Sequence, residues 1–82
     1  MHELSIAMSV LDSVRAEVAK RPGARAIAVG LRIGDLAGLD PESLRFGFEC
    51  LVTDSDLDPL RLEVDSVTGD ALDIAWLEVE EP

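Results

Sequence analysis

The hydrophobic pattern of this chain changes its period at Pro22-Gly23, and this change constrains the fold more than any other feature. From Leu4 to Val18 the apolar residues recur at helical spacing, which predicts an amphipathic helix. From Ala24 to Gly34 apolar residues alternate with smaller or polar ones, which predicts a strand with one buried face. A chain with both patterns is expected to pack helices against a sheet.

The expected core face of this strand carries large aliphatic residues at alternate positions: Ile27, Val29, Leu31 and Ile33. A second helix is expected to begin at Pro41, because Asp40 is a good N-cap and proline suits the first helical position. Helical spacing places Phe46 on the outer side of that helix, where it is available to a partner.

Two more alternating runs, residues 60–65 and 72–79, flank Thr68-Gly69-Asp70 and together predict a β-hairpin. The apolar phase slips within the second run, which predicts a β-bulge near Ala75 and Trp76.

The order of these patterns is helix, strand, helix, strand, strand. The expected fold class is therefore α+β: a two-layer sandwich in which two helices pack on one face of a three-stranded mixed sheet, in the order α-β-α-β-β. Residues 1–82 would form a single domain, and small domains of this length need an efficient core.

The composition narrows the function classes. A net charge of −10 opposes binding to nucleic acids and to anionic membranes. No run approaches the roughly 20 apolar residues of a spanning helix and no export signal precedes the first helix, so we expect a cytoplasmic protein. No catalytic motif is present, and we expect no enzyme activity. With one cysteine and one histidine, the chain lacks the ligands of a structural zinc site.

The polar groups with the clearest metal chemistry stand at the start of the chain, in Met1-His2-Glu3. A free α-amine, main-chain amide nitrogens and an imidazole form a nitrogen-rich donor set that suits Ni(II) or Cu(II). The alternative is a solvent-facing terminal histidine, with Glu3 placed only to favour the positive end of the following helix. The residues alone favour that alternative.

Two other residues have both a metal-binding and a structural interpretation. Asp40 would approach a metal at the chain start as an outer carboxylate, but capping the second helix explains it without metal. Cys50 would be a soft ligand, but a cysteine within a helix is commonly a buried small hydrophobe. We favour the structural interpretation for both.

A family resemblance favours the metal-binding interpretation of the chain start. The opening Met1-His2-Glu3-Leu4-Ser5-Ile6, the block from Leu31 to Gly38, and the segment from Pro41 to Glu49 resemble the HypA hydrogenase and urease nickel-incorporation proteins. This resemblance implies that His2 is the essential nickel ligand and that Met1 and Glu3 contribute main-chain nitrogen. It also implies a carrier that delivers nickel to the large subunit of [NiFe]-hydrogenases, together with a HypB-type GTPase.

The chain departs from this family at Thr68-Gly69-Asp70, where family members insert a zinc-binding module with paired CxxC motifs. We therefore expect Ni(II) binding and no structural zinc. The alternative is a metal-independent interaction module that keeps the fold without nickel transfer. The sequence leaves a homodimer open.

Overall fold

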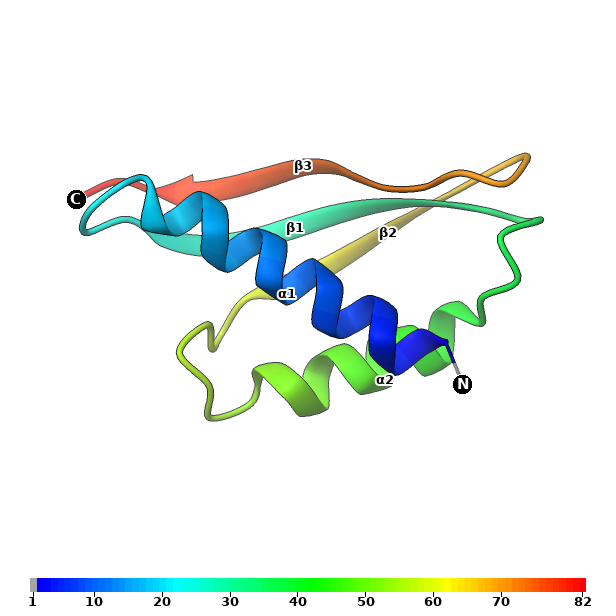
Figure 1. Ribbon diagram of the computed structural model, residues 1–82, viewed down its shortest axis with the longest axis horizontal. Coiled ribbons are helices and arrows are strands. Elements are labelled where there is room, and N and C mark those ends of the chain that lie inside the picture. The colour runs from blue at the N-terminus through cyan, green and yellow to red at the C-terminus, as the bar shows by residue number, and fades with distance from the viewer. Residues whose placement is uncertain (1) are drawn as a thin grey trace.

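The computed structural model describes residues 2–82 and contains the five elements in the predicted order. Both helices begin at the same end of the molecule and run side by side (Figure 1). The elements are α1 (Glu3–Ala19), β1 (Arg25–Gly34), α2 (Pro41–Val52), β2 (Arg61–Val67) and β3 (Leu72–Glu80).

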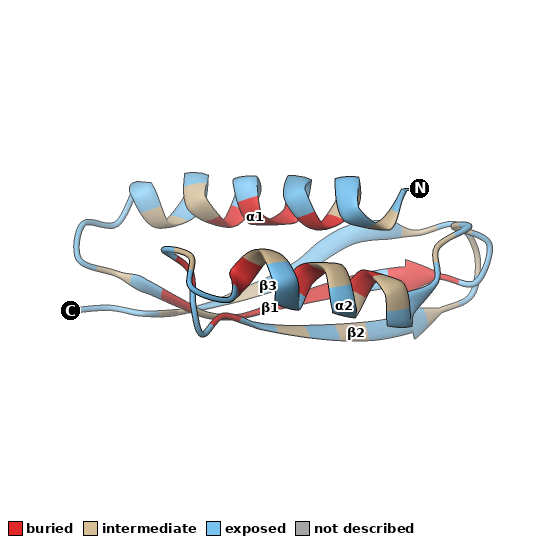
Figure 2. Ribbon diagram, turned by 90° about the horizontal axis from the view of Figure 1, so that it is seen from below, coloured by how far each residue is buried: buried red, intermediate tan, exposed pale blue. Residues whose placement is uncertain are grey.

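The sheet has the strand order β2-β1-β3, with β2 parallel and β3 antiparallel to β1. Both helices cover one face of this mixed sheet, so the predicted α+β sandwich is confirmed (Figure 2). The predicted hairpin is wrong, because β2 and β3 lie on opposite sides of β1. The central place of β1 follows from its burial, since consecutive residues such as Val29, Gly30 and Leu31 are all buried.

The connection from β2 to β3 must cross the end of β1, and Gly34 makes this crossing possible. The Gly34 amide donates to the carbonyl of Ala71 at 2.8 Å, and the Leu36 amide donates to the carbonyl of Gly69 at 2.7 Å. The Asp35 carboxylate accepts from the Gly69 amide at 2.9 Å. A Cβ atom at position 34 would collide with the Gly69 carbonyl group, so only glycine fits there.

Two irregularities interrupt the pairing of β1 with β3. The first lies between Ala26 and Ala28, and it places Ala26 in the core in place of Ile27, which is only partly buried. The prediction that Ile27 belongs to the core face is therefore wrong. The second leaves Ala75 as an extra residue in β3, which confirms the predicted bulge.

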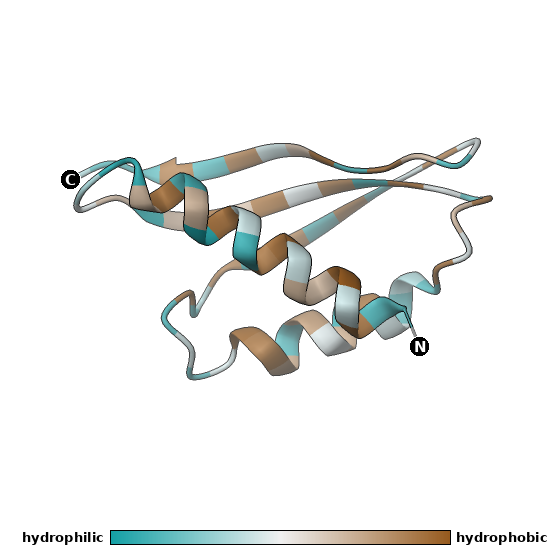
Figure 3. Cartoon of the chain, viewed as in Figure 1, coloured by the Kyte–Doolittle hydropathy of each residue, from teal (hydrophilic) through white to brown (hydrophobic). Residues whose placement is uncertain are grey.

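The core lies between the helices and the sheet, where hydrophobic segments recur along α1 and β1 (Figures 2 and 3). Phe48 is the largest side chain that is fully buried. The principal aliphatic residues of the core are Ala7, Val10, Leu11, Val14, Val29, Leu31, Ile33, Leu44 and Val52.

Cys50 is exposed, so its predicted burial is wrong. Phe46 is exposed, as predicted. Within residues 2–82, neither helix is long and apolar enough to cross a bilayer.

Candidate metal centre

His2 occupies the position immediately before α1 and leaves its imidazole unused by the helix. Its carbonyl accepts the first helical hydrogen bond, from the Ile6 amide at 3.0 Å. Its side chain is exposed and, within the described part of the chain, makes no capping hydrogen bond. The imidazole nitrogens are therefore free to bind a ligand. Met1, the other predicted donor at this end, lies outside the described residues.

Glu3 is held by the start of the second helix. Its Oε2 oxygen accepts a hydrogen bond from the Asp40 amide at 3.1 Å, and this bond is the main cause that lowers the pKa of the Glu3 carboxyl. The Glu3 amide lies in the first turn of α1, where main-chain N–H groups have no acceptor inside the helix. Glu3 thus has a carboxylate engaged by the protein and an amide nitrogen outside the helical hydrogen-bond ladder.

Asp40 acts as the N-cap of α2. Its Oδ1 oxygen accepts from the Glu42 amide at 3.2 Å, and its Oδ2 oxygen accepts from the Ser43 hydroxyl at 2.9 Å. The capping interpretation of Asp40 is confirmed. Both of its carboxylate oxygens already serve the helix, which explains the residue without a metal.

The helix starts give this end of the molecule a particular electrostatic character. The first turns of α1 and α2 lie close together, and both present the positive end of a helix dipole (Figure 1). Glu3 and Glu42 stand in these first turns and offset that charge. An amide nitrogen must lose its proton before it binds metal, so each such donor would bring a compensating negative charge with the ion.

Side chains alone do not form a metal site in the described region. Among residues 2–82, no three histidine, cysteine or acidic side chains gather closely enough to hold an ion. Cys50 instead lines a groove with Leu4 and Phe46 on the outer surface of the two helices. A metal bound by His2 would therefore need main-chain nitrogen to complete its donor set.

The Glu3 to Asp40 contact was not foreseen from the sequence. It joins two residues 37 positions apart, and no local pattern signals a pairing at that distance. The sequence offered Asp40 as an N-cap and as an outer carboxylate near the chain start, but it is the Asp40 amide that makes the contact.

Comparison with known proteins identifies the family. The family model described as hydrogenase/urease nickel incorporation, metallochaperone, hypA, matches residues 1–72. "Hydrogenase maturation factor HypA" of Pelodictyon phaeoclathratiforme is 39% identical over 69 residues, which cover 84% of this chain and 59% of the relative. The protein of the same name from Methanopyrus kandleri is 41% identical over 69 residues, covering 84% of this chain and 49% of the relative.

The relative from Albidiferax ferrireducens is 36% identical over 78 residues, or 95% of this chain and 69% of its own length. The chain thus spans between about half and about seven tenths of the length of these relatives. No solved structure matches the chain. The chain therefore belongs to the HypA family of hydrogenase/urease nickel-incorporation metallochaperones.

Proposed function

We propose that this chain is a nickel-binding accessory protein that carries one Ni(II) for the maturation of a [NiFe]-hydrogenase or a similar nickel enzyme. The observation that carries the proposal is the exposed imidazole of His2 beside the Glu3 amide, which stands in the first turn of α1 outside the helical hydrogen-bond ladder. Family membership supports the choice of nickel as the cargo.

The proposed donors are the imidazole of His2 and main-chain nitrogen from Met1, His2 and Glu3. Nitrogen donors of this kind suit Ni(II), and deprotonated amides offset the charge of the ion. The Asp40 amide donates a hydrogen bond to the Glu3 carboxylate, which supports metal binding by the main-chain nitrogen of Glu3 rather than by its side chain. The helix dipole at this point favours the resulting negative nitrogen atoms.

The proposal also covers the partner proteins and the absence of a structural zinc ion. By family membership, the chain would receive or deliver nickel in company with a HypB-type GTPase and a hydrogenase large subunit. Residues 1–82 would act as a single nickel-binding domain in which the turn at Thr68-Gly69-Asp70 stands where relatives carry a zinc module. With one cysteine and one histidine, this domain would hold no structural zinc.

A metal-independent interaction module is the second candidate. The observation that favours it is Phe46, whose side chain is 70% exposed on the outer side of α2. Leu4 and Cys50 line the same groove, and exposed apolar surface of this kind suits contact with another protein. Nickel titration separates the two candidates, because this module requires no metal.

The test is a calorimetric Ni(II) titration of tag-free protein. Wild type should bind near one ion per chain, and His2→Ala should lose this binding because the remaining donors lack an imidazole. Glu3→Gln is the matched control, since it keeps the main-chain nitrogen of residue 3 and should bind as wild type does. Equal nickel uptake by wild type and His2→Ala would contradict the proposal, provided circular dichroism shows both to be folded.

A further inference from the structure

The outer edge of β3 is available for pairing with another strand. Within the described residues β3 pairs only with β1, so its other edge has no strand beside it. The opposite edge strand, β2, is in contact with Arg45 of α2, whose guanidinium donates to the Leu62 carbonyl at 3.3 Å. An edge strand without a neighbour presents main-chain donors and acceptors that can pair with a further chain.

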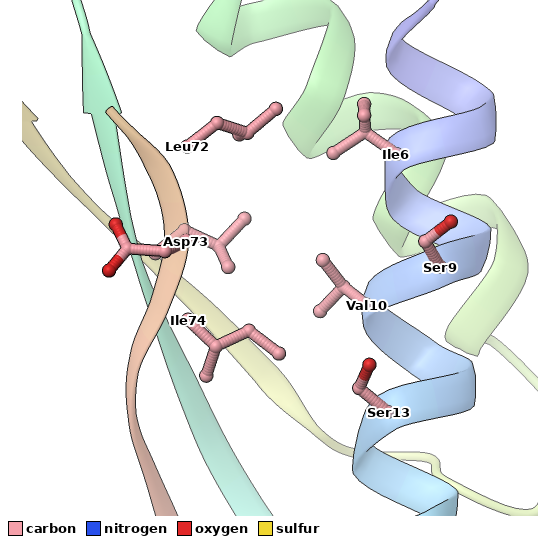
Figure 4. Close-up of a pocket in the computed structure, with 8 residues that line it drawn as sticks. Ile6, Ser9, Val10, Ser13, Leu72, Asp73 and Ile74 are labelled. Atoms are coloured by element: carbon pink, nitrogen blue, oxygen red, sulfur yellow. The ribbon is translucent and has the colours of Figure 1, made fainter. Parts of the chain in front are cut away.

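An apolar groove runs beside this edge, between β3 and α1. Leu72 and Ile74 point from β3 toward α1, while Ile6 and Val10 point back toward them (Figure 4). The groove has a volume of about 260 Å³ and is open to solvent. Leu72 is 40% exposed and Ile74 is 38% exposed, although both face the core side of the sheet. The three-stranded sheet therefore leaves apolar surface uncovered on this side.

The groove continues along the strand. A second hollow shares Ser13 and Ile74 with the first and extends to Leu77 and Glu17. The two hollows together follow β3 across its bulge. An added strand would therefore find places for more than one apolar side chain, at alternate positions along its length.

The charges around the groove select the kind of partner. Among the described residues that line the two hollows, the ionisable ones are Asp73 and Glu17, and both are acidic. The Asp73 carboxylate points to the other face of the sheet (Figure 4). Asp73 is already paired with Arg32, and Glu17 with Lys20. Of the other charged residues of β3, Glu80 is paired with Arg25, and Glu78 has no ion pair among the described residues. A strand that lies against β3 would therefore meet the Glu78 carboxylate beside its polar face, on a chain whose net charge is −10.

We propose that the β3 edge and the groove beside it bind an extended segment of another protein in which apolar and basic residues alternate. Its apolar side chains would enter the groove under α1, and its basic side chains would face Glu78 on the open side of the sheet. Main-chain hydrogen bonds to β3 would supply affinity independent of sequence, and the alternation would supply specificity. A second copy of this chain is a poor occupant, because each copy carries a net charge of −10.

The test uses a synthetic peptide of the length of β3, nine residues, with lysine and valine in strict alternation. The matched control peptide has the same composition in the order Lys-Lys-Val-Val-Lys-Lys-Val-Val-Lys, which places valine on both faces of a strand. The alternating peptide should bind at least roughly tenfold more tightly, because only it can bury all its valines on one side. Amide chemical shifts of residues 72–80 should change most in the titration. Equal binding of the two peptides would overturn the proposal in favour of attraction by charge alone.

Two leucine variants on α1 test the groove itself. Ser13→Leu should fill the groove from its exposed α1 wall and weaken binding of the alternating peptide by roughly tenfold or more. Ser5→Leu is the matched control on an exposed position of the same helix, outside both hollows, and should bind as wild type does. Equal binding by both variants would overturn the proposal. So would a concentration-dependent dimer, seen by sedimentation, that protects the amides of β3 without any peptide.

Discussion

The Oε2 oxygen of Glu3 lies 3.1 Å from the main-chain nitrogen of Asp40, so the first turn of α1 is tied to the start of α2. This contact fixes the residue next to His2 against a rigid element. It also separates two roles of Glu3, since the carboxylate serves the fold while the amide nitrogen remains outside the helical ladder.

This contact predicts an acid-sensitive contribution to stability. The folded-state pKa of Glu3 is lowered, chiefly by the Asp40 amide, so the carboxylate stabilises the fold above its unfolded-state pKa. That contribution should be lost as the pH falls through the lowered folded-state pKa. An NMR titration of the Glu3 carboxyl carbon should show a midpoint below that of an ordinary glutamate.

Substitution of Glu3 tests whether its carboxylate causes this acid-sensitive part of the stability. Glu3→Gln should remove the corresponding part of the pH dependence of the unfolding midpoint. Glu42→Gln is the matched control, because it removes a first-turn acid from α2 and leaves the Glu3 to Asp40 contact in place. A Glu3 carboxyl that titrates as in a free peptide would show that the contact does not hold in solution.

Gly34 should be intolerant of any side chain. Gly34→Ala would drive a methyl group into the Gly69 carbonyl, and we expect it to lower the free energy of unfolding by about 1–3 kcal/mol or more. Gly47→Ala is the matched control. Its Cβ would lie 3.5 Å from Leu4 Cδ1, an ordinary contact, and alanine favours a helix over glycine by about 0.8–1 kcal/mol. Chemical denaturation should therefore show a lower free energy of unfolding for Gly34→Ala and a higher one for Gly47→Ala than for wild type. Equal stability of the two variants would contradict the close approach of the Gly69 carbonyl to Gly34.

Cys50 should be reactive and dispensable for nickel. Its exposure on α2 predicts that a thiol reagent labels it in the native protein without denaturant. Cys50→Ser should bind Ni(II) as wild type does, because no metal-binding cluster within residues 2–82 includes this thiol. Calorimetry of Cys50→Ser beside His2→Ala compares the two candidate ligands directly. Loss of nickel binding in Cys50→Ser would mean that the thiol takes part in the site.

The order of elements could be predicted from the sequence because each depends on local signals. Helical spacing ends at Pro22-Gly23, and the cap at Asp40 with Pro41 marks the start of α2. Strand pairing depends on burial across the sheet, and here the turn signal at 68–70 was misleading. The small residues Ala28 and Gly30 on the second face of β1 were the available sign of a central strand, since the acidic and basic residues of β2 suit an edge.

The candidate site could be predicted only in part. The chemistry of the chain start could be predicted from the sequence, because donor types and their spacing are local. The engagement of the Glu3 carboxylate could not, because Asp40 reaches it only through the packing of α1 against α2. The exposure of Cys50 has a similar cause, since its place relative to α1 decides whether it is buried.

A comparison of nickel affinity between tag-free protein and protein extended ahead of Met1 tests whether the α-amine takes part in the site. An extension turns the α-amine into an amide, and amide nitrogen binds metal only after losing a proton. The extended protein should therefore bind Ni(II) more weakly and only at higher pH, over a titration from about pH 6 to about pH 9. Circular dichroism should show the same helix and sheet content in both. Superimposable nickel-binding curves would contradict a site built from the start of the chain, even if nickel binds elsewhere.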